Sequence, residues 1–401
     1  MPIGNANGKH VLTVEGINMH ELTSVQHAFA EEGATQCGFC TPGFVVSLTG
    51  YCISGDSGNE KAIDWMNGNI CRCTGYKSIE RAAVAVSQII EERKGEDVID
   101  FAISKGFIPP YIKDIPKKLE EWNACDDKPE DSNAEFLVGG GTDLYVQKHD
   151  HINESNIAFV KKSIRSGEVT LNGESVEISG GATVTDLATS KVLAGIFPKM
   201  KEHIKLISST QIRNMATVAG NFTNASPIGD LSVFFLSLNA SLRLQDGESS
   251  RQILLREFFV DYKVLSMRPG EVITKIIFPV PPRGSLFNFE KVSKRTHLDI
   301  ASVNSAMMLQ MNEQDIVAAS ISAGGVAPVP LFLKRTSEML TGKKISAQLI
   351  LDSIDLAMEE VAPISDARGS EKYKRLLLSQ LIKAHFIKFF PELPLQKLLL
   401  A

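Results

Sequence analysis

Five of the six cysteines in this 401-residue chain lie within 37 residues, and their spacing constrains the fold more than any other feature. Cys37 and Cys40 form a C-x2-C pair, and Cys71 and Cys73 form a C-x-C pair after 30 intervening residues. In a reducing compartment such a cluster is more often a metal or catalytic site than a set of disulfides. The segment must therefore fold so that four thiols meet.

The residues around both pairs favour an anionic cluster at the start of two helices. The pairs lie in small-residue loops, QCGFCTPGF and NICRCTGYKS, and each loop precedes a predicted helix. Free N–H groups and the positive end of the helix dipole stabilise a negatively charged metal–thiolate cluster, and Gly38, Gly43 and Gly75 let backbone amides approach it. Four thiolates suit a [2Fe–2S] cluster. The spacing alone also allows tetrahedral zinc, for which C-x-C is unusual, or free thiols.

Charge and composition exclude several classes of protein. The net charge is −5 and the pI is about 6.0, which argues against nucleic acid as the main partner. No apolar run approaches the ~20 residues of a membrane span. The first ten residues contain no apolar stretch of the kind found in secretory signals. We therefore expect a cytoplasmic protein with neither a nucleic-acid nor a membrane partner.

The pattern along the chain predicts an α+β multidomain protein. Helical periodicity covers the first part, a proline-rich and acidic stretch follows, and strands mixed with helices begin near residue 135. Residues 182–193 read as one helix and residues 232–245 as a strand-like run. The expected order is a helical domain (1–95), a linker (96–133), an α+β domain (134–282) and a smaller α+β domain (283–401).

Two segments of the third region suggest a phosphate-bearing ligand. Residues 136–144, FLVGGGTDL, are a strand that runs into three glycines, whose N–H groups could surround a pyrophosphate. This is not a Rossmann fingerprint, because Leu144 stands where G-x-G-x-x-G requires glycine. Residues 213–230, RNMATVAGNFTNASPIGD, supply small polar groups suited to phosphate and ribityl hydroxyls. Taken alone, a tight turn and an ordinary polar loop remain open for these two segments.

Together these motifs resemble one known family. QCGFCTPGFVVSL with NICRCTGY resembles the helical [2Fe–2S] domain of the xanthine dehydrogenase (molybdenum hydroxylase) family. LVGGGTDL followed by ATVAGNFTNASPIGDL resembles the FAD domain of the same family, an α+β fold of the PCMH/VAO type. The resemblance covers about residues 10–390 and implies that Cys37, Cys40, Cys71 and Cys73 are the iron ligands. Cys52 and Cys125 fall outside the motif.

The resemblance also implies a set of FAD-binding residues. Residues 137–144 would surround the pyrophosphate, residues 217–221 would form a second wall, and Asp230 would hold a sugar or ribityl hydroxyl. The full set is Leu137, Val138, Gly139, Gly140, Gly141, Thr142, Asp143, Leu144, Thr217, Val218, Ala219, Gly220, Asn221, Asn224, Ser226, Asp230, Ile273 and Lys291.

The family implies an electron-transfer function. In the family, a molybdenum cofactor domain hydroxylates a purine or another heterocycle, and electrons pass through two [2Fe–2S] clusters to FAD and then to NAD+. We therefore expect an iron–sulfur and flavin subunit of a xanthine dehydrogenase-like oxidoreductase that is not catalytically complete alone. Molybdopterin would lie on a separate large subunit, in a hetero-oligomer with two copies of each chain. No cysteine precedes Cys37, so we expect the ferredoxin-type domain to be on another chain or lost by truncation.

Two alternatives stay open. The chain could serve another molybdenum hydroxylase, of the carbon monoxide, nicotinate or aromatic-CoA type, or it could be a zinc-stabilised regulatory protein without redox activity. His149 and His151 form a possible metal pair, although a solvated loop accounts for them better. We find no Ser/His/Asp or Cys/His nucleophile set, so the sequence predicts no catalytic side chain.

Overall fold

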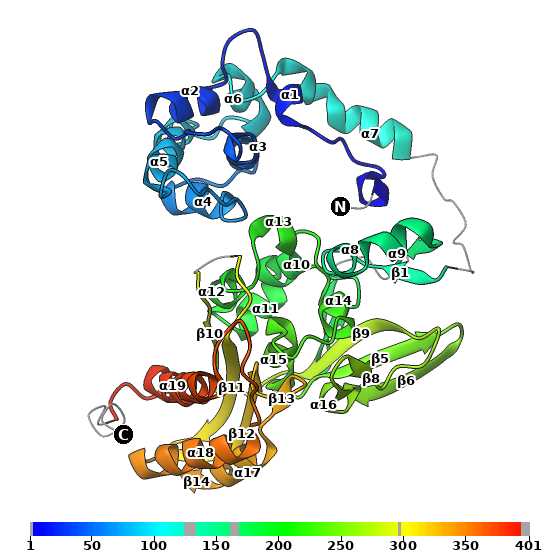
Figure 1. Cartoon of the computed structure of the whole chain (residues 1–401), viewed down its shortest axis with the longest axis vertical. Helices are drawn as coiled ribbons and strands as arrows, with labels where there is room; N and C mark the ends of the chain where they lie inside the picture. Colours follow the sequence, from blue (N-terminus) through cyan, green and yellow to red (C-terminus); the bar gives the residue numbers. More distant parts are fainter. Residues whose placement is uncertain (1–2, 124–133, 161–167, 296–297, 394–401) are drawn as a thin grey trace. The chain divides into compact units, whose positions relative to one another are not determined.

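The computed structural model describes residues 3–123, 134–160, 168–295 and 298–393 (Figure 1). The chain forms two compact units. The first comprises residues 1–131 with 209–211, and the second comprises residues 132–208 with 212–401.

The first unit is helical and has one apolar core. Phe29, Phe44 and Leu48 are buried in this core. The apolar residues of the long helix α5 recur every three or four positions, so they form one buried face. Its elements are η1 (Ile3–Ala6), α1 (Val14–Ile17), α2 (Ser24–Glu31), α3 (Thr41–Cys52), α4 (Asn59–Trp65), α5 (Lys77–Glu91), α6 (Val98–Ser104), η2 (Pro110–Asp114) and α7 (Ile115–Asn123).

Helices continue into the stretch that the composition indicates as a linker. Asp97 caps α6 by accepting hydrogen bonds from the N–H groups of Ile99 and Asp100. Phe101, Ala102, Phe107 and Ile108 are then buried in the core of the helical unit. Because prolines and charged residues dominate the composition of residues 96–133, the sequence pattern did not indicate these few buried apolar residues. Residues 124–133, including Cys125, lie outside the described residues.

The second unit contains two antiparallel five-stranded sheets. The first has the order β3-β4-β9-β5-β6, formed by β3 (Val169–Asn172), β4 (Ser175–Ser179), β5 (Ser241–Asp246), β6 (Ser249–Leu254) and β9 (Val272–Pro279). The second has the order β10-β11-β12-β13, with β14 on β12, formed by β10 (Leu286–Val292), β11 (Val303–Asn312), β12 (Asp315–Gly324), β13 (Leu331–Phe332) and β14 (Lys343–Lys344).

The second sheet is covered on both faces, and its strand β11 contributes side chains to two different apolar cores. Val303, Met307 and Leu309 face one core, which includes residues of α17 (Lys334–Leu340), α18 (Ala347–Glu360) and α19 (Glu371–Phe389). Ala306 and Met308 belong to the other core, together with residues of α15 (Asp230–Leu236). Side chains alternate between the two faces of a strand, so this one strand joins both cores.

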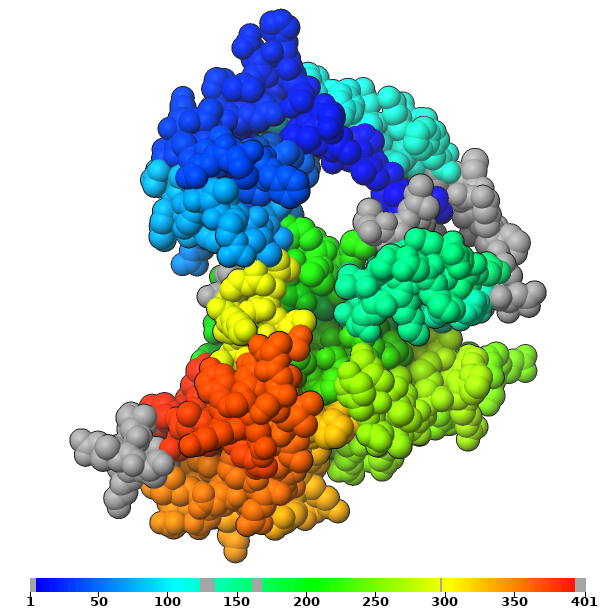
Figure 2. Space-filling model, in the orientation of Figure 1, coloured from blue at the N-terminus to red at the C-terminus, as the bar shows by residue number. Residues whose placement is uncertain are grey.

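Shorter elements frame a cavity in the same unit. Strand β1 (Phe136–Val138) pairs in parallel with β2 (Ile157–Phe159), and β7 (Phe259–Asp261) pairs with β8 (Val264–Leu265). The intervening helices are α8 (Leu144–Gln147), α9 (His149–Glu154), α10 (Val184–Thr189), α11 (Lys191–Ile196), α12 (Met200–Lys205), α13 (Thr210–Arg213), α14 (Val218–Thr223) and α16 (Leu255–Phe258). On the molecular surface, α8 and α9 lie beside the yellow-green segment that carries β5 to β8 (Figure 2).

Two local predictions require correction. Residues 232–245 are not one strand, because they begin in the buried helix α15 and only then enter β5. A short, fully apolar run such as Val233-Phe234-Phe235-Leu236 has no distinguishing period. The predicted helix over residues 182–193 is two helices, α10 and α11, because Ser190 ends one and caps the next.

The predicted domain boundary at residues 282 and 283 coincides with a change of sheet. Pro279 is the last residue of β9, and Pro281 and Pro282 lie between this strand and β10. Phe289 nevertheless packs in the same core as the first sheet. The division into two flavoprotein domains therefore stays a prediction.

Candidate cluster and flavin sites

Each cysteine pair precedes a helix, as the spacing predicts. Cys40 is the residue before α3, and Gly38 has a φ of 80°. On the other loop, Gly75 has a φ of 62°, and Tyr76, with a φ of 69°, is the residue before α5. These left-handed conformations turn both loops sharply at the helix starts, and glycine adopts them without strain.

The four thiols meet as two pairs across the loops. Cys37 Sγ lies 3.6 Å from Cys73 Sγ, and the Cys40 and Cys71 thiols lie close enough for each to shift the pKa of the other. Within the described ranges, no three His, Cys, Asp or Glu side chains are placed to bind one metal ion. Two pairs of thiols suit two metal atoms that each take two thiolates, which is the arrangement of a [2Fe–2S] cluster.

Local donors favour a thiolate at Cys71. The Thr74 hydroxyl donates to Cys71 Sγ at 3.2 Å, and the N–H groups of Cys73 and Thr74 donate at 3.4 Å. These donors lower the pKa of Cys71 to about 7, with the Thr74 hydroxyl as the largest cause. Burial instead raises the pKa of Cys40 to about 11. Because a bound metal requires thiolates, the donors around Cys71 prepare one ligand, and a metal would have to displace the proton of Cys40.

A cavity of about 540 Å³ lies at the glycine loop of the second unit. A backbone bridge between Thr183 and Thr217 holds the second wall in place, and the Thr217 hydroxyl then caps α14 by accepting from the N–H of Gly220. Gly141, with a φ of 73°, ends the glycine turn. Among the residues implied by resemblance, those that line the cavity are Leu137, Gly139, Gly140, Gly141, Thr142, Asp143, Leu144, Thr217, Gly220, Asn221 and Asn224.

The glycine loop packs directly against the second wall. A Cβ atom on Gly140 would stand 1.8 Å from the carbonyl oxygen of Met215, and one on Gly139 would stand 2.9 Å from Thr217 Oγ1. The close approach of the two backbones therefore requires glycine, whether or not a ligand is bound. The three glycines therefore line the cavity with backbone alone, which fits a pyrophosphate-bearing cofactor.

Several residues implied by resemblance do not line this cavity. Val138, Val218 and Ile273 are buried in the protein, Ala219 packs against the core, and Ser226 accepts a hydrogen bond within its own loop. Asp230 and Lys291 bind each other. Lys291 Nζ lies 2.7 Å from Asp230 Oδ2 and donates to the Leu206 carbonyl at 2.9 Å, while Asn304 donates to Asp230 Oδ1 at 2.6 Å. This buried network holds β10, β11 and α15 together behind the cavity wall.

The structure adds residues that the sequence did not single out. Gln147, Lys148 and Lys263 line the cavity, and Lys263 comes from the turn between β7 and β8. Gln147 and Lys148 follow the glycine loop within about one helical turn, so their position in the sequence could have identified them as cavity residues. Lys263 is distant in sequence, and only the packing of the hairpin brings it to the cavity.

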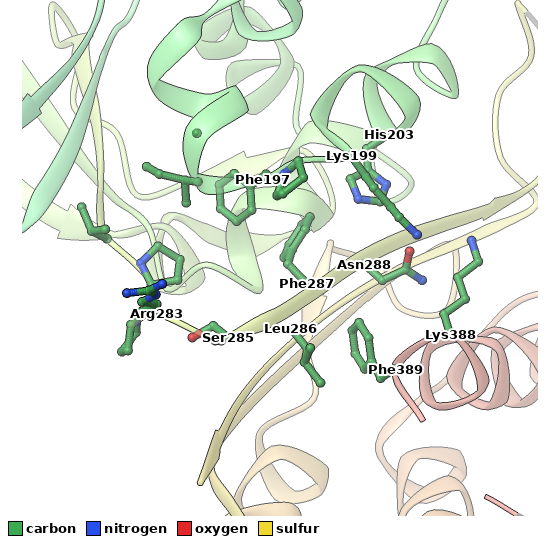
Figure 3. Close-up of a pocket in the computed structure, with 17 residues that line it drawn as sticks. Phe197, Lys199, His203, Arg283, Ser285, Leu286, Phe287, Asn288, Lys388 and Phe389 are labelled. Carbon is green, nitrogen blue, oxygen red and sulfur yellow. The ribbon is translucent and has the colours of Figure 1, made fainter. Parts of the chain in front are cut away.

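A second cavity of about 620 Å³ lies between the start of β10, the α11–α12 segment and the end of α19. Phe197 and Phe287 form an apolar wall, with ring centroids 4.9 Å apart (Figure 3). Lys199 and Lys388 point toward the side where Asn288 lies. Burial lowers the pKa of the lining residue His203 to about 4, so it is neutral at physiological pH.

His149 and His151, the possible metal pair, contact different carboxylates. His149 Nε2 lies 3.0 Å from Asp150 Oδ1, and His151 Nδ1 lies 3.9 Å from Glu135 Oε1. Both side chains are largely exposed. In the part of the chain that the structure describes, no helix is long and apolar enough to cross a membrane.

Both candidate sites lie in residue ranges that match family models of known proteins. Family models match residues 13–84 as a [2Fe-2S] binding domain, residues 114–281 as an FAD binding domain in molybdopterin dehydrogenase, and residues 289–389 as a CO dehydrogenase flavoprotein C-terminal domain. Together these matches cover the cysteine pairs, the glycine-loop cavity and the second sheet.

Individual relatives match the chain to different extents. Xanthine dehydrogenase of Emericella nidulans is 26% identical over 90% of this chain and 31% of its own length. The carbon monoxide dehydrogenase medium chain of Afipia carboxidovorans is 31% identical over 63% of this chain and 87% of its own length. The structure of reconstituted CO dehydrogenase from Oligotropha carboxidovorans has a TM-score of 0.58 at 27% identity, over 62% of this chain and 87% of that one. The chain spans about a third of the length of the xanthine dehydrogenases that it matches.

Proposed function

The chain belongs to the xanthine dehydrogenase (molybdenum hydroxylase) family, and from this premise we propose that it is the iron–sulfur and flavin electron-transfer subunit of such an enzyme. The observation that carries the proposal is the presence in one chain of four thiols in two cross-loop pairs and a glycine-lined cavity. A [2Fe–2S] cluster exchanges single electrons, and FAD exchanges them singly or in pairs, so the two together connect one-electron and two-electron chemistry.

The residues of the first site would hold the cluster and keep it near the surface. Cys37, Cys40, Cys71 and Cys73 would each supply one thiolate, and Thr74 would donate to the sulfur of Cys71. Cys37 and Cys73 are exposed, and Phe39 between the first two cysteines is 94% exposed. We take this exposed aromatic side chain beside the redox site as a contact point for a protein partner. We propose that the partner is a molybdopterin-binding large subunit.

The residues of the second site would hold FAD. The N–H groups of the loop 139–143 would bind the pyrophosphate, and Thr217, Gly220 and Asn221 would form the opposite wall. The electrons would leave to NAD+, with a ferredoxin-type domain between cluster and flavin, in an assembly with two copies of each chain.

Within the family, we favour the xanthine dehydrogenase type over the carbon monoxide type. Xanthine dehydrogenases align with at least 90% of this chain, whereas the carbon monoxide dehydrogenase medium chain aligns with 63%. The alternative keeps the same electron-transfer role and changes only the substrate of the partner.

The test is the cofactor content of anaerobically purified full-length chain. We expect two irons and one FAD per chain, negligible zinc, and a flavin that NADH bleaches without oxygen. One zinc per chain with no flavin would overturn the electron-transfer proposal in favour of the zinc-stabilised regulatory protein. A flavin that NADH cannot reduce would refute NAD+ as the acceptor while leaving the cofactor assignment intact.

A further inference from the structure

One cation reaches the flavin cavity from a distant hairpin. Lys263 occupies the turn between β7 and β8 with a φ of 58°. Phe258 and Phe259 at the base of this hairpin are buried in the main core, with ring centroids 5.5 Å apart. The turn is thus anchored to the core, and Lys263 is one of the residues that line the cavity.

The Lys263 ammonium is held at the end of α14. Its Nζ donates to the Asn224 carbonyl oxygen and, at 3.0 Å, to Asn224 Oδ1. Gln147 Nε2 donates to the same Oδ1 at 3.1 Å. The hairpin, the helix after the glycine loop and the end of α14 therefore meet around one amide side chain at this end of the cavity.

This lysine lacks a carboxylate partner. Over the described residues, no Asp or Glu oxygen lies within 4.0 Å of Lys263 Nζ. Burial lowers the pKa of Lys263, and the positive charge of Lys148 acts in the same direction, opposed by Asp143. Lys263 is nonetheless exposed as a residue, so the absence of a carboxylate partner leaves an accessible cation at the cavity rather than a buried unpaired charge. The lining charges, Asp143 against Lys148 and Lys263, leave an excess of one positive charge in the cavity.

We propose that Lys263 binds the pyrophosphate of a dinucleotide in this cavity, so that the protein selects FAD over riboflavin. The inference rests on the proposed FAD site and deepens it. The loop N–H groups would bind one side of the pyrophosphate, and the Lys263 ammonium would pair with its charge from the other side. A pyrophosphate could come from FAD or from an incoming nicotinamide dinucleotide, and the experiment separates these sources.

A purely structural role is the competing explanation. A cation at the C-terminus of α14 also stabilises the helix through its free carbonyl groups. Lys263→Gln keeps a donor for the Asn224 carbonyl but removes the charge, whereas Lys263→Arg keeps the charge. Lys191→Gln, at the exposed start of α11, is the matched control for loss of a surface lysine.

The experiment uses flavin-depleted full-length chain. Flavin fluorescence titration gives the Kd for FAD and for riboflavin, a thermal melt gives Tm, and anaerobic titration of the FAD-loaded protein gives the NADH concentration for half-maximal flavin reduction. We expect Lys263→Gln to weaken FAD binding roughly tenfold, as for the loss of a hydrogen bond to a charged group. Riboflavin affinity and Tm should stay unchanged, and Lys263→Arg and Lys191→Gln should match the wild type.

The outcomes are distinct. If only the NADH concentration rises roughly tenfold, Lys263 pairs with the pyrophosphate of the nicotinamide dinucleotide, and the selection of FAD over riboflavin is refuted. If neither measurement responds to Lys263→Gln, or if riboflavin affinity falls as much as FAD affinity, Lys263 has only the structural role and the inference is overturned. If the wild-type chain binds no FAD at all, the proposed function itself fails, a result that no Lys263 variant could produce.

Discussion

Replacing Lys291 with methionine should destabilise the flavin unit severely while leaving its cavity lining unchanged. The Lys291 side chain is 4% exposed, and its partner Asp230 is 13% exposed. The substitution keeps most of the aliphatic volume but removes the ammonium that lies 2.7 Å from Asp230 and 2.9 Å from the Leu206 carbonyl. Over the described ranges, the largely buried Asp230 carboxylate would then keep one side-chain partner, the Asn304 amide, which donates to it at 2.6 Å.

The magnitude follows from the burial of the remaining charge. Removing one partner of a buried ion pair costs about 3–5 kcal/mol, because the other charge stays desolvated. Because the Asn304 amide still donates to Asp230, we expect the loss in free energy of unfolding to lie near the lower end of this range, at about 3 kcal/mol. For a unit of this size, that loss corresponds to a fall in Tm of roughly 6–12 °C.

Thermal and urea unfolding of flavin-free protein measure this loss. Lys334→Met removes an exposed pair in the same unit, with side chains 74% and 66% exposed at 3.8 Å, and should cost less than about 0.5 kcal/mol. The double variant Lys291→Met/Asp230→Asn should recover part of the stability, since no charge remains buried. If Lys291→Met unfolds like the wild type and loses only FAD affinity, the side chain is a flavin ligand, as the family resemblance implies, and our reasoning is refuted.

Three further predictions follow from individual contacts. Cys71→Ser should abolish iron binding while FAD remains bound. The matched control is Cys52→Ser, which should keep its iron, because the Cys52 thiol is buried and donates a hydrogen bond to the Leu48 carbonyl. Unchanged iron content in Cys71→Ser would disprove the ligand assignment. Gly140→Ala should disrupt folding of the flavin unit even without FAD, because the added Cβ would stand 1.8 Å from the Met215 carbonyl oxygen. Gly195→Ala is the control, because its Cβ would meet no atom within 4 Å. Equal Tm values for the two variants would show that the glycine loop does not pack as tightly as the structure indicates. Arg251 pairs with both oxygens of Glu271, at 2.6 and 2.8 Å, and holds the pKa of that carboxyl down from 4.5 to about 2. This pair should therefore stabilise the fold above pH 4.5 and lose that contribution as the pH falls toward 2, so that a Glu271→Gln variant with equally steep acid destabilisation would count against it.

The sequence predicted the parts of both sites that depend on local chain geometry. The cysteine pairs do precede α3 and α5, and the glycine run does end a short strand at a cavity. Caps, glycine turns and helix starts involve residues a few positions apart, so their chemistry is visible in the residue order. Helix α15 was missed for the opposite reason, since its apolar run carries no period that separates a helix from a strand.

Resemblance placed Asp230 and Lys291 among the flavin contacts. In the structure the two side chains bind each other and neither lines the cavity, so a role in flavin binding stays a prediction. Their separation of 61 positions in sequence carries no information about which partner each side chain meets. Lys263 shows the reverse case, in which a residue of an unremarkable hairpin reaches the cavity because two buried phenylalanines anchor its turn.

By itself, the sequence determined which groups are available: four thiols at two helix starts, and a run of three glycines after a short strand. The tertiary structure alone decided which donors meet. It pairs Cys37 with Cys73 and Cys40 with Cys71, buries Asp230 against Lys291, and brings Lys263 to the cavity. The physical reason is that the identity and local conformation of a donor are set by neighbouring residues, whereas its partner is set by the packing of sheets and helices that are distant along the chain.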